Sequence, residues 1–182
     1  MNAVERIHSD LADVSRLVLE AGQPSYASTI GGIQAKALLL AAASEFESDL
    51  TAIVLEFCQE RFPYRSIIPE IVQKKAITRQ YHTWFQWDGR NANSFFSLFG
   101  QDFKQFAAGV VNEDDELQDS VANFLKLGAE RNLLVHKDFA RFTLTSTADE
   151  VFERYQKARL FIGRVKKLLE TFEDKQAGGG ES

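Results

Sequence analysis

The chain has 182 residues, of which 45% are hydrophobic and 26% charged, and this composition is typical of a globular protein with one well-buried domain. Its net charge of -5 argues against broad binding of nucleic acid, which needs a basic surface, so any contact with nucleic acid must be local. No apolar run approaches the roughly 18 residues of a membrane span and no secretion signal is present, so we expect a soluble, cytoplasmic protein.

Apolar residues at helical spacing dominate the first third of the chain, and only three prolines interrupt the whole sequence. The first such stripe predicts an amphipathic helix that ends at Gly22 and Pro24. Its members are Val4, Ile7, Leu11, Val14 and Val18. His8 falls just outside the stripe and is predicted to be a surface histidine.

A second pattern predicts a helix over about 30–61, after a linker at 25–29 and before Pro63. Such a helix spans on the order of 45 Å, enough to form the spine of a bundle and leave a face for a partner chain. Cys58 lies in this apolar run and is predicted to act as a small hydrophobic core residue. Glu45 and Glu47 fall off the stripe, which favours a solvated face, although a carboxylate here could also orient His136.

The middle of the chain is rich in aromatic residues. Ile67 to Trp87 is predicted to be a third helix, in which His82 stands among several aromatic residues. These rings could stack nucleic-acid bases, but at near-helical spacing they more often fill a core. A phenylalanine-rich fourth helix is predicted over 95–110 with a bend near Gly100, and the acidic run at 113–116 is interpreted as a solvated loop rather than a cation site.

A fifth helix, predicted from about Leu117 to His136, contains the sequence Arg131-Asn132-x-x-x-His136. Residues four apart stack on one helical face, and the long side chain of Arg131 can reach the same patch. Histidine transfers protons near neutral pH and a guanidinium matches phosphate oxygens, so the group suits RNA cleavage without a metal. Asn132 lies near the apolar stripe and is expected to be partly buried. The structural alternative is a surface arginine and a helix-terminal histidine that binds carbonyls.

The end of the chain is predicted to contain an extended segment at 142–145 and a last helix that begins after the capping box at 147–150. An unbroken apolar ladder from Val151 to Phe172 supports this helix. Its basic residues, Arg154 among them, are interspersed with acidic ones and are interpreted as a solvated face. We expect one domain over 1–176 and a flexible tail at 177–182.

The Arg-Asn-x-x-x-His sequence resembles the signature of the HEPN superfamily of helical domains, and it matches at all three positions. The order of the predicted elements is similar to the RiboL-PSP type of HEPN domain over nearly the whole chain. These elements are the helix containing 42–47, the phenylalanine run ending at Gly100, the motif helix, the extended segment and the closing helix. The expected fold is therefore all-α, an antiparallel helical bundle of about five or six helices with a short extended segment after the motif helix.

The resemblance implies a homodimer, or a pair with a HEPN-like partner, in which two motif helices face each other around one phosphate. His136 would then move protons at the ribose 2′-hydroxyl or the leaving oxygen, Arg131 would stabilise charge on phosphorus, and Asn132 would position them. Asp138 and Glu47 are possible accessory residues. No metal or other cofactor is expected, and the products would carry 2′,3′-cyclic phosphate and 5′-hydroxyl ends.

HEPN toxins that are neutralised by a nucleotidyltransferase commonly carry a tyrosine two residues after the histidine, where this chain has Asp138. This departure argues against control by tyrosine adenylylation, and Asp138 could instead accept a hydrogen bond from a motif arginine of its own or a partner chain. The favoured hypothesis is an endoribonuclease acting as a toxin or antiphage defence effector, with an antitoxin or effector-system partner. The alternatives are a non-catalytic HEPN-like binding module and a plain helical dimerisation domain.

Overall fold

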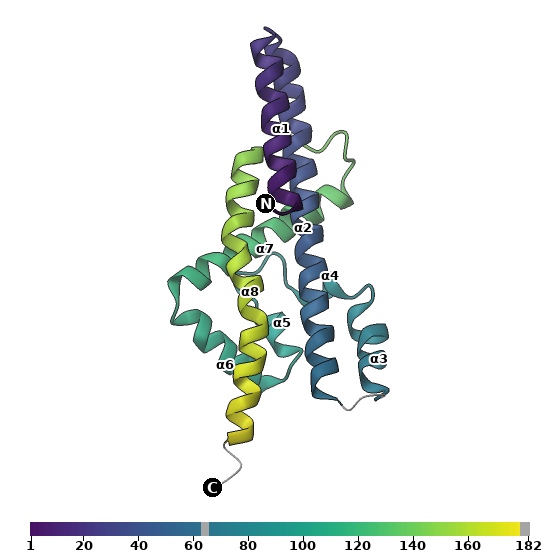
Figure 1. Cartoon of the computed structure of the whole chain (residues 1–182), viewed down its shortest axis with the longest axis vertical. Helices are drawn as coiled ribbons and strands as arrows, with labels where there is room; N and C mark the ends of the chain where they lie inside the picture. The colour runs from purple at the N-terminus through teal and green to yellow at the C-terminus, as the bar shows by residue number, and fades with distance from the viewer. Residues whose placement is uncertain (63–65, 179–182) are drawn as a thin grey trace.

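The computed structural model describes residues 1–62 and 66–178, and every regular element among them is helical (Figure 1). The all-α fold predicted from the sequence is therefore confirmed. The long helices are α1 (Ala3–Glu20), α2 (Pro24–Arg61), α7 (Asp115–His136) and α8 (Ala148–Gly178). The shorter ones are α3 (Ile68–Val72), the π-helix η1 (Gln73–Ile77), α4 (Tyr81–Trp84), α5 (Asn93–Ser97) and α6 (Gln101–Asn112).

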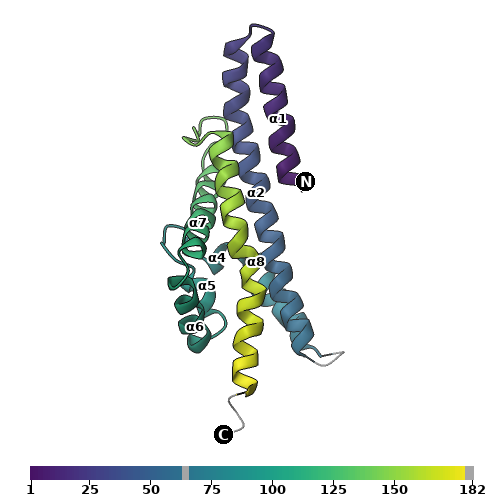
Figure 2. The ribbon, with the colours of Figure 1, turned by 60° about the vertical axis from the view of Figure 1, so that its left-hand side comes forward.

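Helices α2 and α8 lie side by side and form the spine of the molecule (Figure 2). They run parallel to each other, since Glu45 of α2 contacts Tyr155 of α8 while Glu60, further along α2, pairs with Lys166 of α8 at 3.2 Å. Helices α1 and α7 run antiparallel to this pair. The bundle is therefore antiparallel except at its centre, where the segment from α3 to α7 serves as the long crossover that a parallel pair requires.

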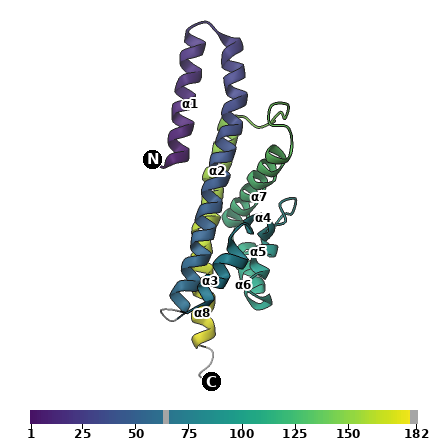
Figure 3. The same cartoon turned by 90° about the vertical axis from the view of Figure 1, so that its right-hand side faces the viewer.

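The turn between α1 and α2 is shorter than predicted, and α2 begins at Pro24 rather than near Ile30. Gly22 has φ +72°, a conformation that ends α1, and Pro24 follows at the first turn of α2, where its fixed φ and missing N–H are favourable. The expected linker at 25–29 is helical. The resulting hairpin projects beyond the other helices (Figure 3), and the apolar side chains near its tip remain exposed, among them Leu17 and Tyr26.

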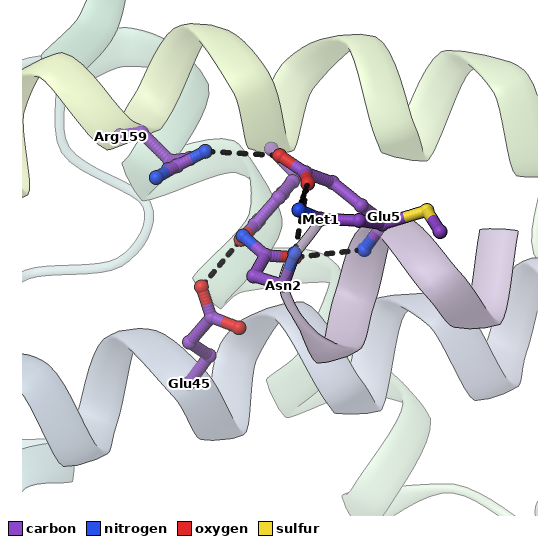
Figure 4. Close-up of polar contacts among 6 residues, drawn as sticks. Met1, Asn2, Glu5, Glu45 and Arg159 are labelled. Atoms are coloured by element: carbon purple, nitrogen blue, oxygen red, sulfur yellow. Dashed lines mark hydrogen bonds and ion pairs between the residues drawn. The ribbon is translucent and has the colours of Figure 1, made fainter.

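A polar network ties the start of α1 to the spine (Figure 4). Asn2 caps α1 by accepting the Glu5 N–H at 2.8 Å, and its side chain donates to the Tyr155 hydroxyl at 2.6 Å. That hydroxyl donates in turn to Glu45, which is thus engaged in the structure rather than merely solvated as predicted. Burial raises the pKa of Tyr155, and Glu45 raises it further. Arg159 closes the network with a 3.1 Å contact to Glu5.

A second link between α1 and α8 involves His8, which was predicted to lie on the surface. Its ring stacks on Phe152 with centroids 4.0 Å apart, and its Nε2 lies 2.8 Å from a carboxylate oxygen of Asp149. The histidine is only half-exposed, so the surface prediction is wrong in this respect.

The helix predicted over 67–87 is not continuous. It is replaced by α3, η1 and α4, and Arg79 adopts a left-handed φ of 61°, which no helix can accommodate. Two indole N–H groups bind backbone carbonyls here: Trp84 donates to Ala76 at 3.0 Å and Trp87 donates to His82 at 3.0 Å. The bend predicted at Gly100 is a complete break between α5 and α6, since this glycine has φ +101°.

The core contains a continuous cluster of aromatic rings contributed by α2 and the helices from α4 to α8. Tyr81, Trp84 and Phe85 are buried, which confirms that the aromatic residues around His82 fill the core, while His82 itself is exposed. Phe85 contacts Phe95 and Phe124 at centroid distances of 4.9 and 4.8 Å. Cys58 lies at the edge of this region, half-buried, and burial raises the pKa of its thiol.

The segment expected to be extended, 142–145, belongs to no helix and to no strand among the described residues. Helix α8 continues to Gly178 and so includes the first two residues of the expected tail. The rest of that tail, 179–182, lies outside the described residues.

Candidate functional site

The candidate site lies at the C-terminal end of α7, a helix that begins with a side-chain cap. Asp114 accepts the Leu117 N–H at 3.0 Å, and Asp115 and Glu116 lie in the first turn, so the acidic run has a structural role at the positive end of the helix rather than forming only a solvated loop. The apolar face of α7 packs against α8 and α2. In its last turn the buried residue is Leu134, whereas Val135 is 46% exposed.

Arg131 is held within the protomer by two contacts. Its Nη1 donates to Asn132 Oδ1 at 3.3 Å, and its Nη2 lies 3.9 Å from Glu47 Oε2 on α2. Asn132 is half-buried, as expected from its place near the apolar stripe. Glu47 therefore contacts the arginine of the motif, and the hypothesis that it orients His136 is not supported by any contact in the structure.

His136 is the last residue of α7 and its side chain is exposed. Within residues 1–62 and 66–178 it forms no hydrogen bond and no ion pair, so its ring nitrogens are accessible to solvent. The structure thus brings Arg131, Asn132 and Glu47 together and leaves the histidine of the motif outside their contacts.

The space behind Arg131 is closed by aromatic side chains. Trp87 packs directly on Gly128 of α7, where any Cβ would come within 1.9 Å of the indole. The remaining cavity has a volume of about 20 Å³ and is lined by Trp87, Phe124, Arg131 and Asn132 among others. This is room for little more than one water molecule, so a nucleotide can reach Arg131 only from the solvent side.

Tyr81 lies on the wall of this cavity. Burial raises the pKa of its hydroxyl, and the negative charge of Glu47 adds to the increase while Arg131 opposes it. The phenol is therefore neutral at physiological pH, and it does not serve as a proton acceptor next to Arg131.

A second group of polar residues, which the sequence did not reveal, anchors the turn that precedes Arg131. Arg154 of α8 donates to both carboxylate oxygens of Glu130 at 3.1 and 3.2 Å and to Ser146 at 2.6 Å. Ser146 also donates to Glu130 at 3.0 Å. The side chains of the ion pair are only 17% and 15% exposed. The prediction that Arg154 belongs to a solvated face is therefore wrong.

Asp138 shapes the loop that follows the motif. Its Oδ1 accepts the Ala140 N–H at 3.0 Å, its backbone carbonyl accepts the Phe142 N–H at 2.8 Å, and its Oδ2 lies 3.5 Å from Arg141 Nε. These contacts are those of an Asx turn. The suggested hydrogen bond to the arginine of its own motif is not formed, because Asp138 pairs with Arg141 while Arg131 faces Glu47.

Among the described residues, no three His, Cys, Asp or Glu side chains are grouped so that they could hold a metal ion. In the same part of the chain, none of the helices combines the length and the apolar character that crossing a bilayer demands.

Comparison with known proteins gives one match. The RiboL-PSP-HEPN family model matches residues 6–171, which is most of the chain and includes α7 and the whole candidate site. No curated protein and no solved structure matches.

Proposed function

Because this chain belongs to the RiboL-PSP-HEPN family, we propose that it is a metal-independent endoribonuclease whose reactive groups are His136 and Arg131. The observation that carries the proposal is the geometry at the end of α7. A half-buried guanidinium is held by Asn132 and Glu47, and an exposed histidine whose side chain has no partner among the described residues follows on the next turn. A fixed cation and an accessible base are the two groups that cleavage of a phosphodiester requires.

In the proposed reaction the 2′-oxygen of a ribose attacks the adjacent phosphorus while the bond from phosphorus to the 5′-oxygen breaks. One histidine accepts the proton of the 2′-hydroxyl and a second donates a proton to the leaving oxygen. The guanidinium of Arg131 stabilises the negative charge that develops on the phosphoryl oxygens, and Asn132 keeps that guanidinium in place. The products carry 2′,3′-cyclic phosphate and 5′-hydroxyl ends.

The motif supplies one histidine per protomer, so two motif histidines at one phosphate come from two protomers. Leu133 and Val135 lie in the last turn of α7 together with His136, and they are 48% and 46% exposed, so this turn presents apolar surface beside the motif histidine. A second copy that covers these side chains would bring its own His136 to the same place. The proposed active form is therefore a homodimer with a composite site.

The proposed biological role is that of a toxin or antiphage defence effector acting on RNA in the cytoplasm, regulated by an antitoxin or by another component of its system. A cleavage assay in the presence of a chelator tests the chemistry directly. We expect the wild type to cut RNA in EDTA and His136→Ala to lose this activity without a change in thermal stability, because the exposed imidazole makes no hydrogen bond or ion pair within the part of the chain that the structure describes.

The matched control is His82→Ala. This histidine is also exposed and lines the cavity behind Arg131, but it does not belong to the motif. The His82→Ala variant should cleave RNA as the wild type does. An RNA with a single 2′-deoxyribose at the cleaved position should resist, because the attacking hydroxyl is absent. Equal degradation by the wild type and His136→Ala would refute the assignment.

Growth of cells that express the protein separates this function from the non-catalytic HEPN-like module. If the protein is a nuclease, Arg131→Ala relieves growth inhibition while the purified variant keeps its oligomeric state. A module that acts only by binding would show neither cleavage nor this relief.

A further inference from the structure

The loop that joins α7 to α8 carries a group of cations and aromatic rings next to His136. Lys36 of α2 donates to the carbonyl oxygen of Phe139 at 2.8 Å, and its ammonium lies 4.8 Å from the centroid of the same ring. Lys137 is placed 5.6 Å from the ring of Phe142. Arg141 completes the group and is 89% exposed. Figure 3 shows this loop at the end of α7, on the same side of α2 as α7.

The local charge is positive although the whole chain is acidic. No aspartate or glutamate occurs between Pro24 and Ser44 in the first half of α2, and Asp138 is the single acidic residue in 136–147. Its carboxylate is already engaged by the Ala140 N–H and by Arg141. Among the described residues neither Lys36 nor Lys137 pairs with a carboxylate, so both ammonium groups can bind an external anion.

Phe139 is the apolar element of this surface. Its side chain is 47% exposed, although Lys36 covers part of one face of the ring. The lysine fixes the ring by a cation–π contact and leaves the rest open to solvent. Lysine is depleted in the contact regions of protein–protein interfaces, whereas cations that surround an exposed aromatic ring are typical of surfaces that bind single-stranded nucleic acid.

We infer that Lys36, Lys137, Phe139 and Arg141 form a platform for single-stranded RNA, in which one base stacks on the open face of Phe139 and the neighbouring phosphates bind the cations. The inference rests on the proposed nuclease function for the role of the bound strand. Three trans peptide bonds separate Phe139 from His136, so their Cα atoms are within about 11 Å of each other. A strand held on the platform would therefore lead directly to the motif histidine.

The platform determines a substrate class. A base can stack on Phe139 only if it is not already stacked inside a duplex, so the preferred substrate is an unpaired segment such as a loop or a single-stranded region. Duplex RNA offers phosphates to the three cations but no free base face, and it should bind more weakly.

The test measures binding of a fluorescently labelled single-stranded RNA by anisotropy, in the His136→Ala background so that no cleavage occurs. Phe139→Ala is expected to weaken binding between about 5-fold and 100-fold, the usual range for loss of one stacked base, while Phe139→Tyr keeps the affinity of the parent. Lys137→Gln should lower the slope of log K against log salt by about 0.7, because one phosphate contact is lost. Lys137 is exposed, so this variant does not depend on the stability of the loop.

The chain provides matched controls far from the loop. Phe62 is 40% exposed at the end of α2, and Lys175 lies over the ring of Phe106 at 4.7 Å near the end of α8. Phe62→Ala and Lys175→Gln remove the same kinds of side chain and should leave both affinity and salt slope unchanged.

Unchanged affinity in Phe139→Ala together with an unchanged slope in Lys137→Gln would overturn the platform. A shift of Phe139→Ala from dimer to monomer in sedimentation, or equal binding of single-stranded and duplex RNA, would overturn it as well. Platform-dependent binding by a protein that never cleaves RNA would refute the nuclease function and leave the platform standing. Normal cleavage by Phe139→Ala, with unchanged KM, would refute the platform alone.

Discussion

The packing of Trp87 on Gly128 gives a prediction that can be calculated from the structure. A Cβ at position 128 would lie 1.9 Å from Cζ3 and 2.0 Å from Cε3 of the indole, whereas carbon atoms in contact are about 3.5 to 4.0 Å apart. The indole would have to move by roughly 1.5 to 2 Å. Its Nε1 donates to the His82 carbonyl at 3.0 Å, and its ring packs against Tyr81, Phe85 and Phe124. Gly128→Ala should therefore overpack the core, at a cost of about 1 to 3 kcal/mol.

Helix propensity acts in the opposite direction, because alanine is favoured over glycine in a helix by up to about 1 kcal/mol. Gly163→Ala in α8 isolates this gain, since a Cβ there meets no atom within 4 Å. In urea denaturation Gly128→Ala should be less stable than Gly163→Ala by about 1 to 3 kcal/mol, and its Tm should be lower by roughly 2 to 12 °C. The double variant with Gly128→Ala and Trp87→Leu should lose less stability than the sum of the two single losses, because the clash disappears together with the indole. Equal stability of the two alanine variants would refute the close approach of Trp87 to α7.

Two further predictions concern charged groups. Arg154→Met leaves the largely buried carboxylate of Glu130 without its cation, so the free energy of unfolding in urea should fall by about 2 to 4 kcal/mol. Lys157→Met removes exposed ion pairs only, so its stability should stay close to that of the wild type. Equal losses in the two variants would show that the pair of Arg154 with Glu130 stabilises the fold no more than an exposed pair does. Burial, with a smaller effect from Glu45, raises the pKa of Asp49 above its ordinary value of 3.8. The folded protein then holds the Asp49 proton more tightly than the unfolded chain, so the stability of the protein falls as the pH rises above 3.8. Asp49→Asn should make this fall less steep in thermal melts recorded at successive pH values. Parallel profiles of Tm against pH for the wild type and the variant would contradict the shift.

The long helices could be predicted because their signals are local. Uninterrupted apolar ladders at helical spacing mark α2, α7 and α8, and these helices were predicted with ends within a few residues of those observed, except for the start of α2. The broken region from 67 to 87 could not be predicted in this way. Its geometry depends on the left-handed Arg79 and on indole N–H groups of Trp84 and Trp87 that bind carbonyls, and these are tertiary contacts that compete with helical hydrogen bonds.

The same distinction between local signals and remote contacts applies to the candidate site. Arg131, Asn132 and His136 are recognisable because they stand within six residues of each other in a helix, and the half-burial of Asn132 follows from the apolar stripe. The partners of this group come from remote parts of the chain. Glu47 reaches Arg131 from α2, and Arg154 reaches Glu130 from α8, but neither has a local pattern that distinguishes it from an ordinary solvated side chain.

Because of these remote partners, the two ends of the motif differ in how firmly their side chains are held. The turn around Arg131 is attached to both spine helices, through Glu47 on α2 and through the ion pair of Glu130 with Arg154 on α8. His136 is attached only through the backbone at the end of α7, and the loop after it is held by Lys36. In the proposed nuclease, a substitution that disturbs the spine therefore acts first on the cation that binds the phosphate. The position of the base depends instead on what covers the end of α7, which is the surface that a second protomer and the bound RNA would share.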